Sequence, residues 1–369
     1  MIKAKLNNEI LRLITEIEKN RYKVSDVKLT KSVASRLRKN SKKKSSYAST
    51  KIEGNPLSEQ QVDEVIERDE RKHFLKPEQE VRNYFLALNY LEEKAEKKEK
   101  FSKKLILDVQ KLVEKGASKE KIGLRGPMPP GVLFAVYDAQ TGAPEYIPPE
   151  YSDIPELLDE LVEYVNTTDD HPLIVAAIVH YQLVTIHPFE DGNGRTARLL
   201  SGYVLDINGF GFNGIGSLEE YFAYDIAEYY ESIQMGLPML YYSGRDEPLH
   251  PEIWITYFLR MVQLYSNKVC ELSEGSSSEE VTGSLSYLKG KEKELLLFLM
   301  NHYRREFTPI EVSKEFHVTN KTIINRLSVL AKNGFVEPIM VKERIRSYAL
   351  SEFTKTHKKE LKKALLGDK

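Results

Sequence analysis

HPFEDGNGRTAR, at His187–Arg198, is the stretch that decides what kind of fold this chain has. Apolar helical patterns flank it, at Pro172–Ile186 and at Thr196–Leu205, so the stretch forms a helix–loop–helix joint with the second helix starting near Gly194. Glycines on both sides of Asn193 permit backbone conformations that other residues avoid, and they let a ligand approach closely. Successive N–H groups that open onto a helix N-terminus form a nest for an anion, so the joint predicts a phosphate site.

Four side chains of this joint supply chemistry around a phosphate. His187 can accept a proton near neutral pH, and Asp191 offers a hard oxygen ligand for a phosphate-bound magnesium ion. Arg195 and Arg198 can project toward one side of the first helical turn and stabilise negative charge. Phosphoryl or nucleotidyl transfer needs this set, because its catalysis is mostly positioning and charge neutralisation. The alternative is a glycine-rich helix connector with an incidental histidine and surface arginines.

The same stretch resembles the signature of the Fic family, HPFx[D/E]GNGRxxR, at every defining position. The resemblance covers roughly residues 45–265, including an upstream EVRNYFLALNYL helix, a proline-flanked hairpin before the motif and the pair Tyr229-Tyr230 after it. It implies a mainly α fold with a helical core and a small β-hairpin flap. The activity it implies is transfer of AMP from ATP to a Ser, Thr or Tyr hydroxyl of a protein, with release of pyrophosphate.

The resemblance also implies a role for each residue of the motif. His187 would deprotonate the target hydroxyl, and Asp191 would hold Mg²⁺ between the α- and β-phosphates. Arg198 would grip the γ-phosphate. Tyr229 and Tyr230 would line the adenine side, with plain helix packing as the alternative. The remaining ATP- and phosphate-binding residues would be Gly192, Asn193, Gly194, Arg195, Thr196 and Ala197. The hairpin around residues 132–147 would dock the target segment by strand addition.

A second motif, Ser49-Thr50-Lys51-Ile52-Glu53-Gly54-Asn55, resembles the inhibitory pattern of the family, [S/T]xxxE[G/N]. A carboxylate at Glu53 that reaches Arg198 would occupy the guanidinium that should meet the γ-phosphate. Because Ser49 and Glu53 precede the core, this inhibition would act within one chain. The alternative is that Glu53 caps an ordinary surface turn.

Length, charge and cysteine content limit which class of protein this chain can belong to. The 369 residues carry a formal net charge of -1, which conceals segments of +10 (residues 1–53), -19 (residues 54–280) and +8 (residues 281–369). This length predicts two or three domains. A single cysteine, Cys270, excludes internal disulfides and indicates a reducing compartment. We find neither a signal peptide nor a membrane-spanning run, so we expect a cytoplasmic protein without membrane contact.

The expected domain boundaries follow composition. We expect an N-terminal helical region with the inhibitory motif (1–60), a Fic domain (61–272), a linker rich in Ser, Glu and Gly (273–284), and a C-terminal domain with a basic tail (285–369). Within these, the patterns predict one or two helices in residues 1–40, a short helix at Ser46–Ile52 and one helix at Leu218–Ile233.

Residues 285–369 resemble a winged helix-turn-helix. Pro309 opens a second helix behind the N-cap Thr308, a third helix follows at Asn320–Ala331, and two strands form a wing. If the domain binds DNA, the residues facing the major groove would be Asn320, Lys321, Thr322, Asn325 and Arg326, and the wing residues meeting phosphates would be Lys342, Arg344 and Arg346. Docking of a protein is the alternative.

The sequence therefore favours an autoinhibited protein adenylyltransferase that uses ATP and Mg²⁺ and modifies a protein, itself included. It leaves three alternatives: removal of AMP by the same site, transfer of another phosphorylated group, and an ATP-sensing DNA-binding regulator. The intact His187 favours chemistry over sensing. The sequence does not identify the target or the signal that relieves inhibition, and it leaves a homodimer open.

Overall fold

The computed structural model describes residues 2–27, 29, 31–67, 73–118, 122–137, 142–237, 240–241, 248–303, 305–341 and 344–366. The chain divides into two compact units. The first comprises residues 1–25 and 31–270, and the second comprises residues 26–30 and 271–369. Each unit has its own core and is described by itself.

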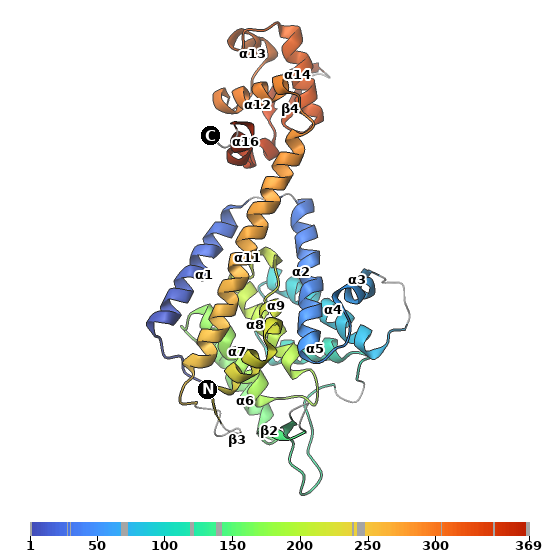
Figure 1. Cartoon of the computed structure of the whole chain (residues 1–369), viewed down its shortest axis with the longest axis vertical. Coiled ribbons are helices and arrows are strands. Elements are labelled where there is room, and N and C mark those ends of the chain that lie inside the picture. The colour runs from blue at the N-terminus through green and yellow to red at the C-terminus, as the bar shows by residue number, and fades with distance from the viewer. Residues whose placement is uncertain are drawn as a thin grey trace. The chain divides into compact units, whose positions relative to one another are not determined.

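The first unit is helical, apart from one small sheet (Figure 1). Its helices are α1 (Asn8–Asp26), α2 (Lys31–Ile52), α3 (Glu59–Glu67), α4 (Lys76–Glu96), α5 (Lys103–Glu114), α6 (Ile154–Thr167), α7 (Pro172–Ile186), α8 (Asn193–Ile207), the 3₁₀ turn η2 (Phe212–Gly214), α9 (Glu219–Tyr224), α10 (Ile226–Gln234) and the part of α11 (Glu252–Leu285) up to residue 270. This confirms the prediction of a mainly α fold.

Helix α7 forms the centre of the core. Its residues PLIVAAIVHYQLVTI are buried on almost every side, which is the pattern of a helix enclosed by other elements rather than a surface helix. The indole nitrogen of Trp254 on α11 donates to the carbonyl of Ala177 at 2.7 Å. Despite this apolar character, neither α7 nor any other helix within the described ranges is long and apolar enough to cross a membrane.

A three-stranded sheet carries the predicted hairpin. Strand β1 (Val136–Tyr137) pairs antiparallel with β2 (Pro144–Ile147), and β2 pairs parallel with β3 (Leu240–Tyr241). Residues 132–135 have no strand pairing, so the first arm is shorter than the apolar run Val132–Tyr137 suggested. The predicted turn at residues 140–142 lies outside the described residues except for Gly142. The third strand comes from far along the chain, and no local pattern indicated it.

Three sequence expectations are wrong in detail, beginning with α2. The structure has one helix of 22 residues where a short one was expected at Ser46–Ile52. The basic run inside it is neutralised by tertiary partners: Lys42 pairs with Glu92 of α4 at 2.5 Å, and Lys43 pairs with Glu67 of α3 at 2.8 Å. Carboxylates from other helices therefore allow like charges to stand next to each other in one helix.

The other two corrections concern where helices break or continue. The helix expected over Leu218–Ile233 breaks at Asp225, whose extended backbone ends α9 and whose carboxylate caps α10 by accepting from the Glu228 amide at 2.9 Å. Residues 273–284, expected to be a linker, lie inside α11. Buried Val281 gives that segment an apolar anchor that its Ser- and Glu-rich composition concealed.

The second unit packs helices and a two-stranded sheet around a core that includes Leu299, Ile323 and Phe335. Its elements, after the end of α11, are α12 (Gly290–His302), α13 (Pro309–Glu315), α14 (Asn320–Lys332), β4 (Val336–Val341), β5 (Arg344–Leu350), α15 (Glu352–Thr356) and α16 (Lys358–Leu366). Strands β4 and β5 are antiparallel. Thr308 caps α13 in a reciprocal pair with Glu311, as the sequence predicted.

Candidate active site

The joint between α7 and α8 holds the predicted site in the expected conformation. His187 ends α7 with a left-handed backbone (φ 48°), and Gly192 precedes α8 with φ 81°. The first helical hydrogen bond of α8 runs from the Thr196 amide to the Gly192 carbonyl at 2.9 Å. The amides of Asn193, Gly194 and Arg195 therefore precede the regular ladder and form the electropositive end of the helix.

The side chain of Asn193 stabilises the loop through two hydrogen bonds. Its side-chain oxygen accepts from the Phe189 amide at 3.1 Å, and its nitrogen donates to the Phe189 carbonyl at 2.9 Å. The side chains of Thr196 and Ala197 are buried. These three side chains are therefore not available to a nucleotide, and the contribution expected from them is limited to the backbone that they shape.

His187 is prepared to act as a base. Its Nδ1 lies 3.3 Å from the Val184 carbonyl, which places the ring hydrogen there and leaves Nε2 as the acceptor. Burial lowers the pKa of His187 to about 4, so the ring is neutral at physiological pH. The ring of Phe134 lies 5.9 Å away, centroid to centroid.

Arg125, which sequence reasoning missed, fixes the backbone around the base. Its Nε donates to the His187 carbonyl at 2.9 Å, its amide donates to the Pro188 carbonyl at 2.9 Å, and its Nη2 donates to the Pro149 carbonyl. Its guanidinium also lies over the Phe134 ring at 4.7 Å. No local motif signals this role, because Arg125 stands in an irregular, proline-rich segment 62 residues before His187.

Arg195 lies at the other side of the joint, almost fully buried. Its Nη2 donates to Glu114 of α5 at 2.9 Å and to Asp191 at 3.2 Å. Its Nε and Nη1 have no hydrogen-bond partner within the described part of the chain, so they keep donors for a ligand. Glu114, also missed by the sequence analysis, is buried, and burial raises its pKa to about 7 although Arg195 opposes the shift.

Arg198 is enclosed by the predicted inhibitory motif. Its Nε donates to the Ser49 hydroxyl at 2.8 Å, and its Nη2 donates to the Ser49 carbonyl at 3.0 Å and to Glu53 Oε1 at 2.6 Å. Burial opposes the charge of Arg198, yet Glu53 raises the pKa of the guanidinium above its usual value. The predicted contact between Glu53 and Arg198 is therefore present in the structure.

Glu53 also lies against the end of α8. A methyl group on Gly194 would meet Glu53 Oε1 at 2.4 Å, so the carboxylate sits on the backbone of the helix's first turn. Gly54 (φ 82°) turns the chain after α2, and the Asn55 side chain donates to the Pro77 carbonyl at 3.0 Å. The carboxylate thus occupies the position that favours an anion at a helix N-terminus.

The two tyrosines have different environments. Tyr229 is buried; its hydroxyl accepts from Arg198 Nη1 at 3.3 Å and lies 3.1 Å from His180 Nε2. Tyr230 is 44% exposed at the rim. Tyr229 therefore positions Arg198, and Tyr230 alone is open to an adenine ring.

The acid limb of the pH–rate profile follows from the pKa of His187. A base with a pKa near 4 stays unprotonated as the pH falls through 6.5. At that pH an ordinary histidine is already half protonated, and half of the enzyme would be inactive. For a reaction that uses His187 as its base, we expect kcat/KM to stay on its plateau down to about pH 5 and to fall only below it. Initial rates measured in buffers with overlapping pH ranges test this. A midpoint of the acid limb near pH 6.5 would contradict it.

Comparison with known proteins agrees with this geometry. Residues 73–205 match the model of the Fic/DOC family. The chain is 29% identical over 201 residues to the protein adenylyltransferase Fic of Drosophila mojavensis, which covers 53% of this chain and 38% of that protein. It is 46% identical over 67 residues to the protein adenylyltransferase fic-1 of Caenorhabditis elegans, covering 17% and 13%. The alignments thus span less than half the length of these relatives.

Solved structures share the fold. A Fic family protein from Desulfovibrio desulfuricans G20 superposes with a TM-score of 0.60 at 20% identity, covering 95% of this chain and 98% of that one. Fic-1 from C. elegans superposes with a TM-score of 0.56 at 24% identity, covering 72% of each chain. Residues 73–205 are therefore similar to the Fic/DOC family, and the chain shares the fold of these solved structures.

Proposed function

We propose that the protein is an autoinhibited protein adenylyltransferase, which transfers AMP from ATP to a Ser, Thr or Tyr hydroxyl of a protein. The observation that carries the proposal is that one short loop joins a neutral His187 to the amides of Asn193–Arg195, at the start of the helix that carries Arg198. The names of the relatives support it, because both are protein adenylyltransferases.

The reaction follows from the positions of these groups. His187 Nε2 takes the proton of the target hydroxyl while the hydroxyl oxygen attacks the α-phosphorus of ATP. The bond between the α-phosphorus and the bridging oxygen breaks, and pyrophosphate leaves. The amides at the start of α8 and the free donors of Arg195 stabilise the charge on the phosphates. Residues 132–135 pass beside His187, as the 5.9 Å contact of Phe134 shows, and would present the target segment to the base.

Asp191 is the residue that would hold Mg²⁺ on the bound triphosphate. Its side chain is 30% exposed next to the helix end. Within the described ranges, no group of three or more His, Cys, Asp or Glu residues could hold a metal by itself. This fits Mg²⁺, which commonly takes one or two carboxylates and completes its shell with phosphate oxygens and water. When bound, the ion would neutralise charge on the phosphates.

Glu53 supplies the inhibition in this proposal. Its carboxylate occupies Arg198 and the end of α8 together, so a triphosphate would have to displace it to bind in the reactive pose. Ser49 holds Arg198 from the same helix, and no second chain is needed.

Mass spectrometry tests the proposed activity. The Glu53→Gly variant, incubated with ATP and Mg²⁺, is expected to gain the mass of one AMP moiety on itself or on lysate proteins. Absence of any adduct with ATP would contradict it. Loss of AMP from a pre-labelled protein, without labelling, would favour the reverse reaction.

A second candidate function belongs to the second unit, where we propose DNA binding. The order α12, α13, α14 and antiparallel β4–β5 supports a winged helix, and the start of α14 exposes Asn320, Lys321 and Asn325. Thr322 and Arg326 are only partly exposed, and the Arg326 guanidinium lies 5.9 Å from the Phe316 ring, so these two contribute less than the sequence suggested. Arg344 and Arg346 on the wing are exposed, whereas Lys342 lies outside the described residues.

Salt dependence distinguishes DNA from protein docking. The full chain is expected to shift a duplex at low salt and to lose affinity steeply as salt rises, because Lys and Arg release counterions from phosphates. Lys321→Ala should weaken binding, and the exposed Lys111→Ala on α5 of the first unit serves as its control. Absence of a shift on any duplex at low salt would favour docking of a protein.

A further inference from the structure

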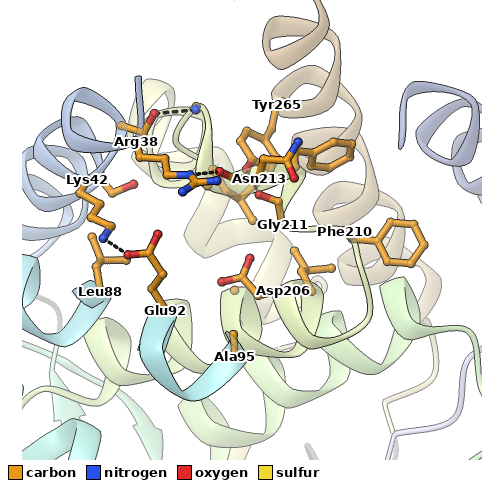
Figure 2. Close-up of a pocket in the computed structure, with 18 of the residues that line it drawn as sticks. Arg38, Lys42, Leu88, Glu92, Ala95, Asp206, Phe210, Gly211, Asn213 and Tyr265 are labelled. Carbon is orange, nitrogen blue, oxygen red and sulfur yellow. Dashed lines mark hydrogen bonds and ion pairs between the residues drawn. The ribbon is translucent and has the colours of Figure 1, made fainter. Parts of the chain in front are cut away.

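The first unit contains a cavity of about 420 Å³ whose lining includes Arg198 but neither His187 nor Asp191. Its walls come from α1, α2, α4, α8, the segment that follows α8, α9, and Tyr265 of α11 (Figure 2). This volume lies in the range of small-molecule pockets, roughly 300–1,000 Å³.

Among the described residues, two oppositely charged side chains of this cavity, Asp206 and Arg38, lack a charged partner. The Asp206 carboxylate points into the space, and within the described part of the chain it has neither a hydrogen bond nor an ion pair (Figure 2). Arg38, on the opposite wall, donates from Nε to the Asn213 carbonyl at 2.7 Å and has no carboxylate within 4 Å among the described residues. The structure thus presents a free anion and a free cation on facing walls.

Two cations of the lining are already paired, and Glu219 accepts from the hydroxyls of Ser45 and Tyr84. Lys42 pairs with Glu92 at 2.5 Å, and Arg21 pairs with Glu18 at 2.8 Å. Partial desolvation and the nearby Glu92 and Glu219 raise the pKa of Asp206 above its usual value, although the residue is exposed on the open side of the cavity. A positive group beside Asp206 would therefore be bound favourably, since it would supply the missing countercharge.

We propose that this cavity binds a small zwitterion of the amino-acid class, whose ammonium group meets Asp206 and whose carboxylate meets Arg38. A carboxylate fits the planar donor fork of Arg38, of which only Nε has an acceptor. The apolar lining, which includes Leu88, Leu205 and Tyr265, would take the side chain of the ligand.

The position of the cavity connects it to the inhibitory helix. Arg38, Ser41, Lys42 and Ser45 line it, and their spacing places them on one face of α2. The next residue on that face is Ser49, which holds Arg198. A ligand in the cavity binds only while α2 forms this wall, so binding stabilises the inhibited state. This regulatory role rests on the proposed function.

Binding is tested without any activity. Calorimetry of the wild-type protein against the L-amino acids identifies the tightest binder, which is then compared with its decarboxylated and deaminated analogues. We expect both analogues to bind at least about 10-fold more weakly, since each loses one charge-assisted contact. Asp206→Asn should abolish binding, whereas the exposed loop variant Asp169→Asn should not change it. Failure of every amino acid to bind, or unchanged binding by Asp206→Asn, would overturn the proposal.

Coupling is tested by labelling with ATP. At a hundred times its dissociation constant, the tightest binder should shift the equilibrium toward docked α2 by about 100-fold. Wild-type labelling should therefore fall, and labelling by Glu53→Gly should not respond. Binding that leaves wild-type labelling unchanged refutes the regulatory role, whereas absence of labelling in every variant refutes the proposed function and leaves the calorimetric result standing.

Discussion

Glu53→Gly is expected to raise self-labelling with ATP by roughly 10- to 100-fold. The variant removes the 2.6 Å contact with Arg198 and clears the carboxylate from the end of α8. A hydrogen bond between charged groups is worth about 1.5–3 kcal/mol, and 1.4 kcal/mol corresponds to a factor of ten. Without this contact, the γ-phosphate should gain access to Arg198 by about that factor, and the labelling rate should rise with it. Initial rates with labelled ATP measure the change.

Two further variants make this result specific. Glu53→Gln keeps the size of the side chain but loses its charge, so its labelling should lie between wild type and Glu53→Gly. Glu59→Gly, at an exposed position at the start of α3, should label as slowly as the wild type. Labelling by Glu53→Gly that stays at the wild-type rate would remove the inhibitory role of this carboxylate.

His187→Ala, introduced into the Glu53→Gly background, is expected to reduce labelling by about 100- to 10,000-fold. A positioned general base contributes this much, and Nε2 of His187 is the acceptor that the Val184 contact leaves free. Binding of ATP should persist, because the helix end and Arg198 are unchanged. Rates and nucleotide affinity measured on the same sample separate the two effects.

The control replaces a histidine outside the site. His250→Ala, at an exposed loop position, should leave the labelling rate of the Glu53→Gly background intact. Thermal unfolding of each variant confirms that the chain is folded. Retention of most activity in the His187→Ala variant would show that another group takes the proton, and it would refute the proposed mechanism.

Local signals predicted the backbone of the joint between α7 and α8 well. The end of α7, the glycine turn and the start of α8 lie within a few residues of each other, so residue type alone constrains their backbone. The same holds for the cap at Thr308, where Pro309 and Glu311 stand at fixed spacings. Errors arose where local composition misled, as in the Ser-rich segment of α11.

Residue identity and spacing by themselves determined the mainly helical class and the glycine turn before α8, and they made His187 the base that we propose. Only the tertiary structure decided that Arg125 anchors the loop and that Glu114 pairs with Arg195. It also brings Glu53 to Arg198 across 145 positions, a contact that the resemblance of the sequence had implied. It alone also formed the cavity beside Asp206. The reason is physical: a turn follows from the conformational freedom of adjacent residues, whereas a contact between distant segments depends on how whole helices pack.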